Sequence, residues 1–185
     1  MKKIITNLLI LASINTSIID AKEVHIVPMA EKDGMSYVLL GLNGNWSYFS
    51  GSTQQKGKEV KSGDVVESIV KNKVGLDLAQ IKSSELIKTN NSEEVWLVKL
   101  TKFIPKESLP KGDDTERVWV SQQQIINSPK NFVIKSEKTN YETALDYNTF
   151  LDLKNVFSRI KNVKLNNSLT KLASSFANLT TALSS

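Results

Sequence analysis

The side chains best suited to chemistry lie in one stretch of the chain, from Gly44 to Leu78. This stretch carries Glu59 in a polar, glycine-bearing loop, followed by Asp64 and Glu67 in a segment with helical periodicity. Because residues three apart in a helix share a face, Asp64 and Glu67 place two carboxylates on one side of this segment. The three-residue spacing of Asp64 and Glu67 also fits a capping box at the start of a helix. Ser62 is a second candidate for the N-cap residue.

Three aromatic side chains, Trp46, Tyr48 and Phe49, come just before this loop. Aromatic rings combine a large apolar surface with a flat face, so this neighbourhood is a candidate ligand-binding site. Aromatic side chains also fill protein cores, and we expect at least two of the three to do so.

Several other kinds of chemistry have no support in the sequence. The chain has no cysteine and a single histidine, His25, which lies in a strand-like segment. Zinc sites and Cys-His catalysis can therefore be set aside. The sequence also contains no phosphate-binding loop of the Walker type, no Rossmann glycine fingerprint and no Gly-x-Ser-x-Gly elbow.

The elements that must position the carboxylates are a strand end, the loop and a short helix. A set of aliphatic residues recurs at helical spacing and predicts one buried helix side: Val65, Val66, Ile69, Val70 and Val74. Gly75 follows the last of them, at the position where a glycine commonly ends a helix in the left-handed conformation.

This arrangement resembles the Nudix hydrolase family, whose motif is written G-x5-E-x7-R-E-U-x-E-E-x-G-U, where U is an aliphatic residue. Gly75 and Leu76 match the closing G-U pair, and Val70 falls on the aliphatic position before it. Trp46 and the loop of residues 50–52 lie upstream, where the family has a tryptophan at a strand end and a glycine-bearing loop. The resemblance implies that the structural frame of the motif is present.

The chemical positions of the motif are occupied by other residue types. The family's Arg-Glu pair falls on Ser68 and Ile69, and its Glu-Glu pair falls on Asn72 and Lys73. In the family these glutamates hold Mg²⁺ or Mn²⁺ against a diphosphate, a task that needs anionic oxygen ligands. We therefore expect no cofactor, and a protein that binds a nucleotide-like ligand or a protein partner without standard diphosphate hydrolysis.

The alternative is a divergent Nudix hydrolase that acts on nucleoside-diphosphate-linked substrates. In that reading relocated carboxylates would hold Mg²⁺ or Mn²⁺, namely Glu59, Asp64 and Glu67. Asp64 and Glu67 are the candidate metal ligands, and Glu59 and Glu67 are the candidate catalytic carboxylates. Whether the chain is an enzyme is left open by the sequence.

The order of the remaining elements extends the resemblance from about Val24 to Ile126. We expect strands over residues 23–29, 36–42 and 94–103, a hairpin turn at Asp33-Gly34, an irregular segment over 77–91, and a strand running into a short helix over 117–125. This order implies a Nudix-like α/β/α sandwich of the α+β type, with a mixed sheet and helices on both faces.

Residues 1–21 have the form of a secretory signal peptide. A basic start, Met1-Lys2-Lys3, is followed by a mostly apolar run over residues 4–14 and by the small residue Ala21. We therefore expect a secreted or periplasmic protein. An uncleaved amphipathic helix or a buried first strand is the alternative.

The rest of the chain is expected to form a domain over residues 22–150 and a basic amphipathic helical tail over 151–185, with helical character from Asn140 onward. The formal net charge is +5, and no acidic residue follows Asp152, so the basicity belongs to the tail. A heptad-like apolar stripe runs through it: Leu165, Leu169, Leu172, Phe176 and Leu179. Such a stripe covers its own domain, self-associates or contacts an acidic membrane surface. We expect no nucleic-acid binding, because the basic residues alternate with leucines and not with stacking aromatics.

Overall fold

The computed structural model describes residues 21–55, 57–110, 116–128, 132–136 and 142–160, together with residues 168, 170 and 171. The signal-peptide prediction falls almost wholly outside these residues, and so does the apolar stripe of the tail: Leu165, Leu169, Leu172, Phe176 and Leu179. Both stay predictions. Within the described part of the chain, no helix is long and apolar enough to cross a membrane.

The longer strands are β1 (Glu23–Lys32), β2 (Met35–Asn43), β7 (Ile81–Thr89), β8 (Glu93–Leu100) and β9 (Arg117–Ser121). The shorter ones are β3 (Asn45–Ser47), β4 (Phe49–Ser52), β5 (Gln54–Gln55), β6 (Lys58–Glu59), β10 (Val133–Lys135) and β11 (Glu142–Ala144). Two α-helices are α1 (Ser62–Ile69) and α2 (Gln122–Asn127), and a third helix, here called the closing helix, begins at residue 147 and is described to residue 160. The described residues also include a π-helical turn (Val70–Val74) and two 3-10 turns (Leu78–Gln80 and Lys106–Ser108).

The central sheet has the order β3-β2-β1-β8-β7, with β4 also paired to β1 and β9 also paired to β2. Strands β1 and β8 run parallel, whereas the other pairs in the sheet are antiparallel. The hairpin between β1 and β2 turns at Asp33 and Gly34, both with positive φ, as the Asp-Gly pair predicts. The mixed sheet expected from the sequence is therefore confirmed.

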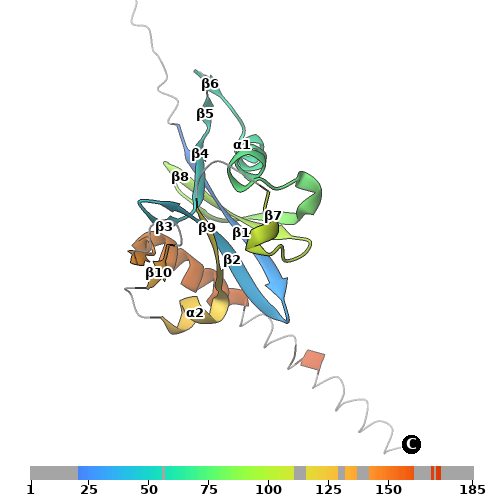
Figure 1. Ribbon diagram of the computed structural model, residues 1–185. Helices are drawn as coiled ribbons and strands as arrows, with labels where there is room; N and C mark the ends of the chain where they lie inside the picture. Colours follow the sequence, from blue (N-terminus) through green and yellow to red (C-terminus); the bar gives the residue numbers. More distant parts are fainter. Residues whose placement is uncertain are drawn as a thin grey trace, which may run out of the picture.

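Each face of the sheet carries its own core. On one face, Val24 and Ile26 of β1 pack with the buried side of α1. On the other face, Val27 and Met29 of β1 pack with Phe157 and other residues of the closing helix. Figure 1 shows α1 and the closing helix on opposite sides of the sheet. Because successive side chains of β1 point to opposite faces of the sheet, this strand contributes to both cores, and the result is the expected sandwich.

Helix α1 begins differently from the prediction. Lys61 is the N-cap residue and makes no side-chain capping bond, so neither Ser62 nor Asp64 is the cap. Ser62 lies inside the first turn, where its side chain hydrogen bonds to Glu94 instead. Full capping boxes occur elsewhere, at Asp77 before the first 3-10 turn and at Ser121 before α2.

The end of this helix follows the prediction. The aliphatic set from Val65 to Val74 is buried, and Gly75 has a left-handed backbone with φ of 76°. The backbone N–H of Leu76 donates to the carbonyl of Val70 at 3.0 Å. Arg117 of β9 donates to the carbonyl of Val74 at 2.6 Å, which places a cation at the negative end of the helix.

Three segments differ from the sequence-based expectation. Residues 50–52, predicted to form a loop, lie in strand β4, which pairs with β1. Residues 81–89, predicted to be irregular, form strand β7, because backbone pairing with β8 holds a strand whose side chains are mostly exposed and lack a burial pattern. Residues 142–144, predicted to be helical, form strand β11, which pairs with β10. The closing helix runs across the predicted boundary at residue 150, and Leu153 and Phe157 beyond it are fully buried.

Candidate functional site

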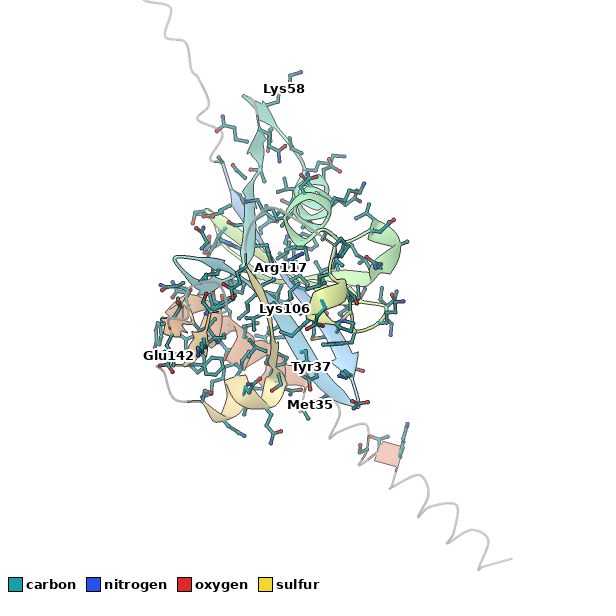
Figure 2. The ribbon with its side chains drawn as sticks, viewed as in Figure 1. Met35, Tyr37, Lys58, Lys106, Arg117 and Glu142 are labelled. Carbon is teal, nitrogen blue, oxygen red and sulfur yellow. The ribbon has the colours of Figure 1, made fainter. Side chains whose placement is uncertain are left out.

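The predicted carboxylates lie on the outside of the molecule. Glu59 belongs to β6 in the short hairpin β5–β6, and Asp64 and Glu67 lie on the exposed side of α1. Figure 2 shows Lys58, the neighbour of Glu59, at the outer end of this hairpin, away from the body of the domain. Among the described residues, no group of three or more His, Asp or Glu side chains is arranged to hold a metal ion.

The motif positions lie on α1 and on the π-helical turn after it, and one of them serves packing. Ile69 is only 3% exposed and belongs to the core between α1 and the sheet. Asn72 is exposed, and its Nδ2 donates to Oγ of Ser68 at 3.1 Å, one turn back along the helix. Lys73 is half-buried. Of the three positions that carry metal-binding glutamates in the Nudix motif, one is therefore part of the apolar core.

Strand β4 approaches this helix very closely at Gly51. A Cβ atom at this position would lie 3.1 Å from Val65 and 3.2 Å from Ile69. Only glycine gives this approach without displacing the helix side chains. The glycine-bearing loop predicted from the sequence thus acts in helix packing.

The three aromatic side chains do not share a surface. Trp46 is fully buried in the core under the closing helix, where its Nε1 donates to the carbonyl of Ile134 at 3.2 Å. Phe49 is buried in the core under α1, on the opposite face of the sheet. Tyr48 packs against the core of Trp46. Trp46 and Phe49 are therefore core residues on opposite faces of the sheet, as expected for at least two of the three rings. The binding site at Trp46, Tyr48 and Phe49 stays a prediction.

Tyr48 takes part in a charged cluster that the sequence did not indicate. Its hydroxyl donates to Oδ2 of Asp152 at 3.2 Å, and Lys88 donates to the same oxygen at 3.1 Å. Lys88 also bridges to Glu93 at 2.9 Å, and His25 lies 3.7 Å from Glu93. The cluster joins β1, β7, β8 and the closing helix, so its members come from distant parts of the chain and no local pattern marks them.

The pKa shifts in this cluster keep Tyr48 neutral, Lys88 positively charged and Glu93 negatively charged near neutral pH. Burial and the neighbouring Asp152 carboxylate raise the pKa of Tyr48 far above its usual range. The hydrogen bond to Glu93 raises the pKa of Lys88, and the same bond lowers the pKa of Glu93. A lysine held charged and a tyrosine held neutral are poor general bases, and the cluster fits a structural role.

Outside this cluster, the carboxylate of Glu94 lies near the beginning of α1. Glu94 accepts hydrogen bonds from Lys22 at 3.3 Å and from Nε1 of Trp96 at 3.1 Å, in addition to the Ser62 side chain. Burial acts to raise the pKa of Glu94, but these hydrogen bonds outweigh it and hold the pKa below its usual value. The indole ring of Trp96 is thereby fixed against the core under α1.

One hollow lies on each face of the sheet beside β7; they are here called the cavity beside α1 and the groove. The first, of about 280 Å³, lies between α1 and β7 and includes Val66, Glu67, Ser84 and Trp96. The second, of about 470 Å³, lies on the other face, where the described part of the closing helix ends at Ile160. Sequence reasoning missed both, because their walls come from segments far apart in the chain.

Comparison with solved structures shows that this fold is the Nudix-like fold. The NUDIX domain of Shewanella oneidensis NrtR complexed with ADP ribose matches with a TM-score of 0.52 and 11% identity, covering 84% of this chain and 99% of that chain. The Nudix hydrolase RenU from M. smegmatis matches with a TM-score of 0.48 and 12% identity, covering 78% and 86% of the two chains. A mutT/nudix family protein from Listeria innocua matches with a TM-score of 0.47 and 15% identity, covering 78% and 95%.

Neither a scan of protein-family models nor a search of curated proteins finds a match. At these identities the structural likeness establishes the fold alone. The α/β/α sandwich predicted from the sequence is thus confirmed, and the role of the chain must be argued from its own residues.

Proposed function

We propose that this chain is a Nudix-fold binding protein that does not perform metal-dependent diphosphate hydrolysis. The observation that carries the proposal is the burial of Ile69, which is 3% exposed at a position where the motif needs a metal-binding glutamate. The other two positions hold the amide of Asn72 and the ammonium of Lys73. A cation beside the site would repel the metal that the reaction requires.

The expected loss of rate is large. Removing a positioned general base typically lowers a rate by about 10² to 10⁴, and losing the metal removes electrostatic stabilisation as well. Asp64 and Glu67, the carboxylates nearest to the motif, are exposed side chains on α1, and Glu59 lies in a separate hairpin. Exposed carboxylates on different elements bind a metal weakly, because ordering them costs conformational entropy.

The Nudix-like fold and the cavity beside α1 support the binding of a ligand. The NrtR domain that shares this fold holds ADP ribose, which makes a nucleotide-like molecule the first ligand to test. The cavity beside α1 offers the apolar side chain of Val66 and the ring of Trp96, with Glu67 and Ser84 as polar neighbours. Apolar walls with a few polar groups are typical of ligand sites. A protein partner is the other class of ligand that the proposal includes.

The test is a binding titration paired with product analysis on the chain without its first 21 residues. ADP ribose is titrated calorimetrically, and the same mixtures are then incubated with Mg²⁺ or Mn²⁺ and analysed chromatographically for AMP. The proposal predicts no AMP above the background without protein, in the parent and in Glu67→Gln alike. Metal-dependent release of AMP that disappears in Glu67→Gln would establish the hydrolase instead.

We also propose that the protein is exported. The support is the basic start, the apolar run over residues 4–14 and the small residue Ala21. Expression of the full chain in a bacterial host, followed by fractionation and N-terminal sequencing, tests this. A mature protein that begins near Lys22 in the periplasm or medium supports export, and an intact chain in the cytoplasm contradicts it.

A further inference from the structure

Strand β7 forms an edge of the central sheet. It pairs with β8 from Ile81 to Thr89, with irregularities in register between Ile81 and Ser83 and between Leu86 and Lys88. No other strand of the described chain pairs with it. The outward-facing N–H and C=O groups of such an edge are ready to pair with another strand. Most side chains of β7 are exposed, including Leu86, which is 41% exposed.

On one side of this edge lies the cavity beside α1, to which β7 contributes Ile81 and Ser84. Trp96 of β8 forms part of its wall. Leu86 is the register partner of Trp96, so its exposed side chain lies on the same face of the sheet. This side of the edge is therefore predominantly apolar.

On the other side of the edge lies the larger groove, to which β7 contributes Lys82, Glu85 and Ile87. Met29 and Leu97 form an apolar part of the groove, and Arg159 and Ile160 of the closing helix form one wall. Lys99 and Lys102 add two further cations. The acidic members of the lining are Glu31 and Glu85, so four cationic residues face two acidic ones. The groove thus combines an apolar surface with a rim that is basic on balance.

The charges of this rim are only partly compensated. Lys99 bridges to Glu85 at 3.0 Å. Lys82, Lys102 and Arg159 are exposed and form no ion pair within the described part of the chain. An acidic group entering the groove would meet several cations close to an apolar surface.

We propose that β7 is a docking edge for an extended acidic peptide of a partner protein, which adds to the sheet as a further strand. Successive side chains of a strand point to opposite faces, so alternate residues of the added peptide would lie over the groove and over the cavity beside α1. Peptides bound in this way gain affinity from main-chain hydrogen bonds and specificity from pockets for alternate side chains. The expected sequence alternates acidic and apolar residues.

Two other occupants fit the charges less well. The end of this chain has no acidic residue after Asp152 and would bring further cations to the basic groove. A second copy of β7, paired antiparallel about its central residue, would place Glu85 opposite Glu85 and Lys82 opposite Lys88. Like charges directly opposite each other destabilise a strand pair.

The peptide proposal names a partner for the binding role proposed above, and therefore rests on it. The experiment measures fluorescence anisotropy of a labelled peptide matched to the nine residues of β7, with alternating Glu and Val. Two N-methylated versions carry the methyl groups on the odd or on the even residues. Because only alternate N–H groups of an added strand face the sheet, one version is expected to bind at least about tenfold more weakly than the other.

Protein variants test the charge argument. Lys82→Glu combined with Lys102→Glu is expected to weaken binding by about tenfold or more, and to reduce its salt dependence. Lys71→Glu is the matched control, because Lys71 is exposed on the turn after α1 and lines neither hollow. It is expected to change affinity by less than about twofold.

Equal affinities of the two N-methylated peptides, or equal effects of the control and the double variant, overturn the proposal. So does the absence of binding at millimolar peptide, or ultracentrifugation that shows dimers whose stability changes with Lys82→Glu. If the peptide does not bind but ADP ribose does, only the proposal that β7 is a docking edge is rejected. Metal-dependent AMP release rejects the proposed function and leaves the peptide result unaffected.

Discussion

Replacing Ile69 with glutamate restores the residue that the Nudix motif has at this position. In this chain the side chain is 3% exposed and packs in the core between α1 and the sheet. Truncating a buried isoleucine costs about 2 to 5 kcal/mol, and an uncompensated buried carboxylate costs several kcal/mol more. We therefore expect Ile69→Glu to lower the free energy of unfolding by about 4 kcal/mol or more, a large share of the 5 to 15 kcal/mol typical of a domain.

Urea unfolding followed by tryptophan fluorescence measures this loss. With a slope of about 2 kcal/mol per molar urea, the midpoint is expected to fall by about 2 M. Two variants separate burial from the change of residue type. Ile69→Val keeps the apolar contact and is expected to cost about 0.5 to 1.5 kcal/mol. Asn72→Glu places the same carboxylate at an exposed position and is expected to change stability by less than about 0.5 kcal/mol. Equal midpoints for Ile69→Glu and the parent would refute the assignment of Ile69 to the core.

Three further predictions concern stability. The hydrogen bond from Lys88 lowers the pKa of Glu93, so its contribution is complete above the unfolded-state pKa of about 4.3 and is lost as the pH falls through the lower folded-state pKa. In Glu93→Gln the acid-side loss should shrink by a few tenths of a kcal/mol, since both groups are partly exposed; an unchanged profile contradicts this. Gly51→Ala should destabilise by about 1 kcal/mol through crowding against α1, whereas Gly63→Ala, with open space around it, should stabilise by about 0.5 to 1 kcal/mol; denaturant midpoints in the reverse order count against the packing argument. Trp46→Phe should cost about 1 to 3 kcal/mol in thermal unfolding while ADP ribose binding to the folded variant is unchanged; weakened binding by a well-folded variant would return Trp46 to the site.

The part of the fold that local chemistry specifies could be predicted from the sequence. The helical spacing of aliphatic residues from Val65 to Val74 marks the buried side of α1 and of the π-helical turn after it, and Gly75 marks the end of that turn. The Asp33-Gly34 pair marks the first hairpin. Strand β7 could not be predicted in this way, because an edge strand is held by backbone bonds to β8 and its exposed side chains need no pattern.

The candidate site was harder to predict, because its residues meet only in three dimensions. The odd spacing between Trp46 and Phe49 was a usable signal, since an odd separation in extended chain places side chains on opposite faces. No such signal connects Lys88 with Asp152, which come from β7 and the closing helix. The hollows beside β7 likewise depend on the sheet order and on where the helices lie.

Metal binding is the measurement that tests the central claim most directly. Calorimetric titration of the chain from Lys22 onward with Mn²⁺, and then with Mg²⁺, asks whether a metal site exists on the Nudix-like frame. With Ile69 in the core and Asn72 and Lys73 beside it, we predict no saturable heat at millimolar metal. A stoichiometric site of millimolar or tighter affinity, lost in Glu67→Gln, would contradict the account and identify a metal-dependent enzyme.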